Sequence, residues 1–414
     1  MLRPSPACAH GQLLRLSRPT VILALGTAQT LAWASSYYLP AILADPISRE
    51  LGIPATGVFA AFSAALLLSA ALGPAVGRAI DRRGGRGVLC LSSAVFAAGL
   101  ALLATAHGPV LLGIAWLVLG GGMALGLYDS AFATLAGLCG RDARGPITGI
   151  TLIAGFASTV GWPLTTLLND VVGWRDACLA WAGLHLALGL PLNRFLVPLA
   201  PPPAPVDAML PARDVGPDAA PRGAMVLLAF VFAATWVVST GMAAHLPRLL
   251  QAAGVGTSAA VAAATLVGPA QVAARLVEFG LLRRMHPLVS ARVATVLHPV
   301  GAAALVLFGG PAAAVFTVLH GAGNGMLTIA KGTLPLALFG PAGYGLRTGL
   351  LSAPARVAQA AAPLLFGFLI DRVGTGALAV SAGLGLASTA ALLALHTPRP
   401  VTRLGPARIN HHRA

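Results

Sequence analysis

The chain has 414 residues, of which 57% are hydrophobic and only 9% are charged, whereas soluble globular proteins carry roughly a quarter of their residues as Asp, Glu, Lys and Arg. This composition excludes a water-soluble globular protein, and the apolar runs that fill the chain leave no room for a sizeable soluble domain. The formal net charge of +15 does not indicate nucleic-acid binding, because the basic residues lie between the apolar runs and not together on one folded face.

The apolar runs predict twelve transmembrane helices in two sets of six, since about 20 apolar residues cross a bilayer. The first set is expected near residues 19–43, 57–80, 88–106, 109–138, 146–168 and 175–197. The second set is expected near residues 224–248, 257–282, 289–309, 311–339, 347–370 and 375–396. A run rich in Pro and Ala separates them and predicts a flexible linker. The prediction is therefore an all-α membrane protein with an N-terminal bundle (1–197), a linker (198–222) and a C-terminal bundle ending in a short tail (223–414).

The basic residues predict the orientation of the chain. Most of the 27 Lys and Arg residues fall in the two termini, the linker and alternate loops. Because positive residues resist translocation, both termini are expected on the cytoplasmic side of a bacterial inner membrane. The four cysteines have no paired spacing, and free thiols are expected.

The two sets of helices look like copies of one another at an offset of about 200 residues. Gly73-Pro74-Ala75 corresponds to Gly268-Pro269-Ala270, and Asp170-Val171-Val172-Gly173 corresponds to Asp371-Arg372-Val373-Gly374. The shared order and the near-constant offset are the evidence for a repeat. Two such halves, related by a pseudo-twofold axis along the membrane normal, are typical of carriers that rock around a central site.

The loop after the second predicted helix reads Gly77-Arg78-Ala79-Ile80-Asp81-Arg82-Arg83-Gly84-Gly85-Arg86. It resembles the cytoplasmic signature of the major facilitator superfamily, a glycine, three residues, then Asp-Arg-x-Gly-x-Arg. The resemblance implies a secondary transporter that works by alternating access, with Asp81, Arg82 and Arg86 in a gate. Gly77 would let two helices approach closely. The alternative is that these residues are ordinary loop charges that set the topology.

Asp81 offers a negative charge either to a helix N-terminus or to Arg141 and Arg144, in the loop after the fourth predicted helix. The corresponding loop of the second half, around Arg283, has lost the aspartate. The gating role implied for the first loop is therefore not extended to the second.

Two further features resemble monocarboxylate and oxalate–formate carriers of the same superfamily. One is the stretch from Arg144 to Arg175, and the other is the pair of intramembrane arginines, Arg275 and Arg356. The resemblance implies that both arginines grip the carboxylates of a small organic anion, for which a guanidinium offers a charged, bidentate fork. The rival functions are efflux of drugs or of a toxic species such as arsenite, hinted at by Cys90 and Cys139, and a membrane sensor that moves no solute.

Ionisable side chains inside a membrane are costly, so each is a functional hypothesis. Glu278 follows Arg275 by three residues, so the two either neutralise each other or leave Arg275 to bind substrate and Glu278 to exchange a proton. Asp129 and Lys331 occupy equivalent places in the two repeats. They either form an ion pair that gates the cytoplasmic side or extend independently toward the interface.

The remaining candidates are aromatic residues and a histidine. Tyr37, Tyr38 and Trp236 either wall the cavity or belong to an interfacial belt. His320 is either a proton relay or a histidine bonded to a neighbouring helix. The sequence contains no phosphate-binding loop, no clustered metal ligands and no Ser-His-Asp set. We therefore expect a monomeric non-enzyme without a cofactor or metal, whose partners are a small solute, possibly with protons, and membrane lipid.

Overall fold

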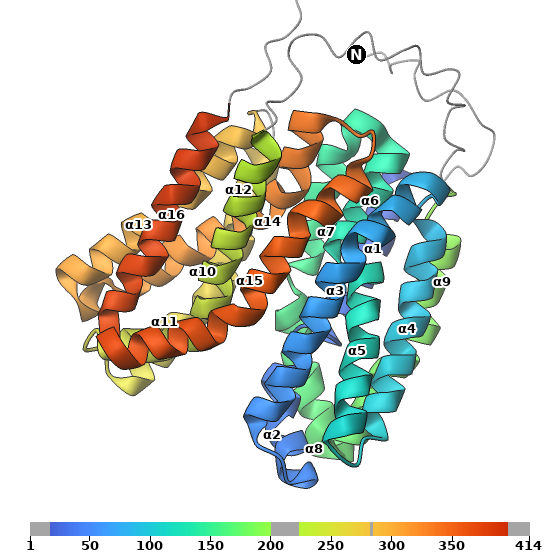
Figure 1. Cartoon of the computed structure of the whole chain (residues 1–414), viewed down its shortest axis with the longest axis horizontal. Coiled ribbons are helices and arrows are strands. Elements are labelled where there is room, and N and C mark those ends of the chain that lie inside the picture. The colour runs from blue at the N-terminus through green and yellow to red at the C-terminus, as the bar shows by residue number, and fades with distance from the viewer. Residues whose placement is uncertain (1–16, 200–222, 282–284, 396–414) are drawn as a thin grey trace, which may run out of the picture.

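The computed structural model describes residues 17–199, 223–281 and 285–395, and every regular element within these ranges is helical (Figure 1). The N-terminal group of helices comprises α1 (Arg18–Ala34), α2 (Pro40–Leu51), α3 (Ala55–Arg83), α4 (Arg86–Ala104), α5 (Pro109–Gly126), α6 (Tyr128–Cys139), α7 (Arg144–Ala154), α8 (Ala157–Leu184) and α9 (Leu190–Phe195). The C-terminal group comprises α10 (Ala224–Ala252), α11 (Thr257–Thr265), α12 (Val267–Gly280), α13 (Pro287–Phe308), α14 (Ala313–Phe339), α15 (Tyr344–Val373) and α16 (Ala377–Ala394).

Eight helical stretches of the described chain are long and apolar enough to cross a membrane. The predicted ranges fall on helices, but several of those helices are broken. Pro40 begins α2 after a break in the predicted span 19–43, extended backbone at Leu127 separates α5 from α6, and Gly173 interrupts α8 in the left-handed φ region that favours glycine (φ 82°). The pieces α1 and α2 are each shorter than a full span, so the total of twelve spans stays a prediction.

At the break after α1, serine side chains bond to carbonyl groups of the last helical turn. The hydroxyls of Ser35 and Ser36 donate hydrogen bonds to the carbonyls of Leu31 and Ala32, at 2.8 and 2.5 Å. Non-helical backbone at membrane depth is tolerated where it is buried in protein or lines a cavity. The breaks therefore mark the part of the molecule where a site is to be sought.

Large apolar side chains lie on both the inside and the outside of the molecule. Trp116, Phe96 and Phe316 are fully buried, while Val110 and Leu307 are 76% and 75% exposed. Water disfavours such an apolar exterior, whereas lipid does not. The exterior therefore fits a chain surrounded by a bilayer.

The two groups of helices meet at one end and diverge at the other (Figure 1). At the closed end, which carries Asp81 and the start of α15, α3 and α6 pack on α15, and α7 packs on α12 and α14. The open end carries α2, α11 and Gly173. There, α2, α8 and α11 each pack mainly on helices of their own group. The limits of the two predicted bundles stay a prediction, because most of the linker lies outside the described residues.

Glycines bring α3 and α15 into backbone contact at the closed end. A Cβ added at Gly77 would overlap the carbonyl of Gly345, and one added at Gly349 would lie 2.6 Å from the carbonyl oxygen of Gly73. Any larger residue at these positions would separate the two helices. The expectation that Gly77 permits a close helix approach is met in this geometry.

Candidate functional site

Asp129 and Arg356 form an ion pair between the two groups of helices. Arg356 Nη2 on α15 lies 2.8 Å from Asp129 Oδ2, and Ser352 donates a hydrogen bond of 3.0 Å to Asp129 Oδ1. Asp129 stands in the first turn of α6, just after the break at Leu127, where the positive end of the helix dipole favours a carboxylate. The side chains of Arg356 and Asp129 are only 14% and 23% exposed, so the pair is largely removed from water.

Lys331 on α14 points its ammonium at an aromatic face. Its Nζ lies 4.2 Å from the ring centre of Trp236 and 5.9 Å from that of Phe232, within the range of a cation–π contact. In this structure the partner of Asp129 is therefore Arg356, and the ion pair between Asp129 and Lys331 considered from the sequence is not formed. The side chain that reaches Asp129 comes from α15 and not from α14.

Aromatic and amide side chains surround these charges. Gln359 on α15 donates a 2.7 Å hydrogen bond to the hydroxyl of Tyr37. Trp33 lies at ring-centre distances of 5.1 Å from Tyr37 and 5.0 Å from Tyr128. Tyr38 packs edge-on against Trp162 of α8, with 5.8 Å between the ring centres.

These groups enclose a small cavity of about 30 Å³. It is lined by Trp33, Tyr37, Leu66, Leu127, Tyr128, Asp129, Phe132, Trp236, Thr328, Lys331, Arg356 and Gln359. The volume holds a water molecule or two. Two basic side chains, Arg356 and Lys331, and one carboxylate, Asp129, line the cavity. Of the predicted wall residues, Tyr37 and Trp236 line it directly, and Tyr38 packs behind Trp33.

Arg275 and Glu278 lie one turn apart on α12, yet each points to a different neighbour. Glu278 accepts a 3.4 Å contact from Arg144 of α7. The only hydrogen bond described for Arg275 is a 3.4 Å bond from Nη2 to Gln271 on the same helix. The mutual neutralisation considered from the sequence is therefore not the arrangement found, and Arg275 does not share the small cavity of Arg356.

Asp81 caps the start of α15 at the closed end. Its two carboxylate oxygens accept hydrogen bonds from the backbone N–H groups of Gly345 and Leu346, both at 2.8 Å. Of the two partners considered from the sequence, the helix N-terminus is the one found. Arg82 is exposed and Arg86 is half-buried, and within the described residues neither makes an ion pair.

A second contact links the groups at the closed end on the other side of the interface. Arg144, at the start of α7, donates to the carbonyl oxygen of Met285 at 2.5 Å and contacts Glu278 on α12. Glu278 is almost fully buried. Sequence reasoning missed this link because it assigned Glu278 to Arg275, three residues earlier on the same helix, whereas Arg144 comes from a distant segment.

Two buried histidines face each other inside the C-terminal group. His298 Nδ1 on α13 lies 3.0 Å from His320 Nδ1 on α14. A second cavity of about 30 Å³ adjoins them, with the hydroxyl and amide groups of Thr235, Ser239 and Asn324 in its wall. No Asp, Glu, Lys or Arg lines this cavity. His320 is thus bonded to a neighbouring helix, with a hydrogen shared between two imidazoles.

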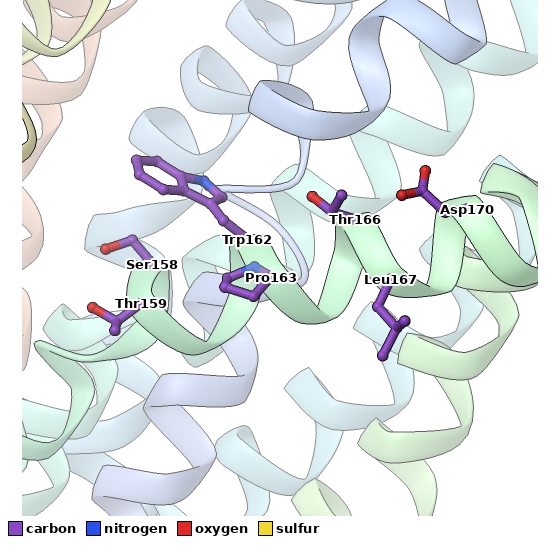
Figure 2. Close-up of a pocket in the computed structure, with 7 residues that line it drawn as sticks. All are labelled: Ser158, Thr159, Trp162, Pro163, Thr166, Leu167 and Asp170. Atoms are coloured by element: carbon purple, nitrogen blue, oxygen red, sulfur yellow. The ribbon is translucent and has the colours of Figure 1, made fainter. Parts of the chain in front are cut away.

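An open hollow of about 690 Å³ follows one face of α8 near the open end. Figure 2 shows its lining residues spaced along the helix: Ser158, Thr159, Trp162, Pro163, Thr166, Leu167 and Asp170. All of these lining residues belong to α8. The hydroxyls of Ser158 and Thr159 lie at one end of the face and the carboxylate of Asp170 near the other (Figure 2).

Polar contacts fasten the N-terminal group at the open end. Glu50 of α2 accepts hydrogen bonds from the Trp174 indole and, at 2.9 Å, from Arg175 Nε. Arg175 also donates to the carbonyl oxygens of Ala104 and Ala106, at 2.5 and 2.8 Å. One guanidinium thus ties the end of α2 to the end of α4.

These contacts predict an acid-induced change at the open end. The hydrogen bonds from Arg175 and Trp174 lower the pKa of Glu50 below its ordinary value of 4.5. Their stabilisation is therefore complete above about pH 4.5 and is lost as the pH falls through the lowered pKa. Tryptophan fluorescence of the purified protein should show a transition below pH 4.5. Glu50→Gln should remove that transition, and an unchanged titration would contradict the assignment.

A family model and a known protein each match part of the sequence. The family model described as Major Facilitator Superfamily matches residues 25–318. The chain is 34% identical over 153 residues to an uncharacterized 38 kDa protein in the 23S RNA operon of Thermoproteus tenax, a match covering 37% of this chain and 40% of that protein.

Solved structures match over most of the chain. The human organic anion transporter MFSD10 (TETRAN) gives a TM-score of 0.65 at 19% identity, covering 91% of this chain and 99% of that one. The proton:xylose symporter XylE bound to 6-bromo-6-deoxy-D-glucose gives 0.69 at 14%, covering 91% and 96%. The transporter FucP in the outward conformation gives 0.69 at 13%, covering 91% and 98%. At these identities the likeness shows the fold alone.

Proposed function

Because the chain belongs to the major facilitator superfamily, it is a multi-pass membrane transporter, and we propose that it carries a small organic anion by alternating access. The observation that supports this substrate class is the lining of the central cavity, where two basic side chains, Arg356 and Lys331, accompany a single carboxylate, Asp129. We place the closed end in the cytoplasm of a bacterial cell, following the distribution of basic residues. The structure is then that of an outward-facing carrier.

In this proposal a substrate carboxylate enters from the open end and replaces Asp129 on Arg356. The guanidinium binds it in a bidentate manner, while Tyr37, Trp236 and Gln359 position the remainder of the molecule. Asp129, once displaced, turns to Lys331, which lines the same cavity. This exchange of partners gives Asp129 and Lys331 the gating role proposed from the sequence. It also couples binding of the substrate to a change in the contacts between the two groups of helices.

Closure at the open end accompanies separation at the closed end. The contacts that must break are the Asp81 cap on α15 and the link from Arg144 to Glu278. Once it is separated from Arg144, the carboxylate of Glu278 is able to take up a proton from the cytoplasm. We therefore keep Glu278 as a proton-coupling candidate and give Arg82 and Arg86 supporting roles in the same gate.

The second coupling candidate is His320, which shares a hydrogen with His298. Replacing His320 with glutamine removes one imidazole from the pair and with it the site of a second proton. Uptake into proteoliposomes driven by an imposed pH gradient should fall about tenfold, whereas exchange across the membrane without a gradient should be retained. A variant whose gradient-driven uptake equals that of the parent would remove the histidine pair from coupling.

A substrate screen in proteoliposomes tests the function as a whole. Radiolabelled mono- and dicarboxylates, a cationic drug and arsenite are offered with and without a pH gradient. Saturable carboxylate movement is the expected result. Movement of the drug or of arsenite alone would favour the efflux functions, and failure to move any solute would favour a sensor.

A further inference from the structure

The break between α5 and α6 decides where the side chain of Asp129 lies. Leu127 has extended backbone (φ −82°, ψ −174°), and α6 begins at the next residue. An extended residue advances the chain by about 3.3 Å, whereas a helical residue advances it by about 1.5 Å and turns it through about 100°. The direction in which Asp129 leaves α6 therefore depends on the break two residues before it.

Two side chains bond to carbonyl groups at the end of α5. The hydroxyl of Ser130 donates to the carbonyl oxygen of Ala124 at 2.9 Å, and the amide Nε2 of Gln29 donates to that of Gly126 at 2.5 Å. A helix leaves its last four carbonyl groups without partners inside the helix, and burying such a group without a hydrogen bond is costly. These two bonds therefore stabilise the broken form of this segment relative to a continuous helix.

Gln29 reaches the break from a different helix. It lies on α1 and is 1% exposed. On another side, the backbone of Gly126 lies against α4, because an added Cβ would come within 2.5 Å of the Ser92 hydroxyl and 2.9 Å of a ring carbon of Phe96. The break is thus held between α1 and α4, and the contact from α1 is a directional hydrogen bond.

The residues that follow Gly126 form part of the central cavity. Leu127, Tyr128 and Asp129 all line it, and Asp129 there pairs with Arg356. Gln29 is not among the lining residues. Any effect of Gln29 on the cavity must therefore pass through the backbone of the break.

We propose that Gln29 is a positioning residue of the anion site. By bonding to the carbonyl of Gly126, it fixes the start of α6 so that Asp129 reaches Arg356 in the outward-facing carrier. This inference rests on the proposed anion transport and adds to it a residue that touches no substrate.

Gln29→Met, which keeps the length of the side chain but removes the amide, should have opposite effects on binding and on turnover. Because Asp129 competes with the substrate for Arg356, loosening the break should lower the Kd of malonate and acetate severalfold. An Asp129 that is poorly placed reaches Lys331 less readily, so maximal uptake should fall about tenfold. Gln29→Asn, with a shorter amide side chain, should lie between. General damage to the fold would instead weaken binding and slow uptake together.

Asn193→Leu is the matched control. The amide Nδ2 of Asn193, on α9, also donates to a backbone carbonyl, that of Leu89 on α4, at 3.1 Å. Its amide oxygen, like that of Gln29, has no partner in the described part of the chain, and Asn193 does not line the central cavity. Asn193→Leu should lower the apparent melting temperature about as much as Gln29→Met but leave Kd and maximal uptake at the parent's values.

Thermal unfolding of the purified full chain tests the positioning role without a substrate. Gln29→Met and Asp129→Asn each loosen the pair with Arg356, so the double variant should lose less in melting temperature than the two single losses added together. Asn193→Leu combined with Asp129→Asn should lose the full sum. Ser130→Ala removes the other bond at the break, should couple to Asp129→Asn in the same sense, and provides the same test should Gln29→Met not fold.

The outcomes separate the positioning role from the proposed function. Additive thermal losses for Gln29→Met and Asp129→Asn would overturn the positioning role, and so would weaker binding of malonate and acetate by Gln29→Met. A parent that binds neither malonate nor acetate would overturn the proposed anion transport. In that case the additivity of the thermal losses would still decide whether Gln29 positions Asp129.

Discussion

Arg356→Ala is expected to reduce saturable uptake at least a hundredfold, because it removes the cation proposed to hold the substrate and also leaves Asp129 unpaired. Breaking a buried ion pair by deleting one partner costs about 3–5 kcal/mol, and the pair here is mostly removed from water. Arg356→Lys keeps the charge but offers no bidentate fork. It should retain partial uptake with a KM raised more than its maximal rate is lowered.

Radiolabelled carboxylate uptake into proteoliposomes measures both variants. Arg372→Ala is the matched control, because Arg372 lies on the same helix at the open end and rests on Phe368. It should transport like the parent. If Arg356→Ala and Arg356→Lys both match the parent, Arg356 is not part of the substrate site.

Asp81→Asn combined with Glu278→Gln is expected to open the closed end in the resting protein. Asp81 makes two charge-assisted hydrogen bonds to backbone N–H groups, and Glu278 pairs with Arg144, contacts worth roughly 1.5–3 kcal/mol each. Each single change should shift the balance of states by about tenfold or more, and the double change by about a hundredfold or more. Net uptake should fall accordingly, because the carrier no longer returns readily to the outward-facing state.

Alkylation of an introduced cysteine measures this opening directly. Leu336 of α14 is buried against residues of the N-terminal group at the closed end, among them Phe132 and Ile147. Leu336→Cys in a background without other cysteines should be unreactive when both contacts are intact and reactive in the double variant. Leu250→Cys, buried inside the C-terminal group, should stay unreactive in both. Unchanged labelling of Leu336→Cys would show that the two contacts do not hold this end closed.

The fold was accessible from the sequence because lipid imposes a simple length rule on apolar runs, and the signature around Asp81 identified the family. For Asp81 the sequence left two partners open, and of these the helix N-terminus is the one found. The break at Gly173 falls between the predicted spans 146–168 and 175–197, whereas the break before Pro40 falls inside the predicted span 19–43 and was missed. The break at Leu127 had no local signal.

The ion pairs of the site were less accessible for a physical reason. Helix α15 has no one-sided distribution of apolar residues, so its sequence does not say which face turns toward the other group. Whether Asp129 meets Lys331 or Arg356 depends on that rotation and on how far the two groups rock. Glu278 likewise could be assigned to Arg275 by spacing along one helix, whereas its actual partner, Arg144, comes from a distant segment brought in by tertiary packing.

The cap on α15 has a consequence for how the chain can vary. Asp81 bonds to main-chain amides, which every amino acid except proline supplies. Mutational drift can therefore change the side chain at Leu346 freely without disturbing that bond, and only Leu346→Pro would delete its donor. Gly345 has no such latitude, since the backbone of α3 lies against it. Two neighbouring positions in one contact thus evolve under unequal constraint.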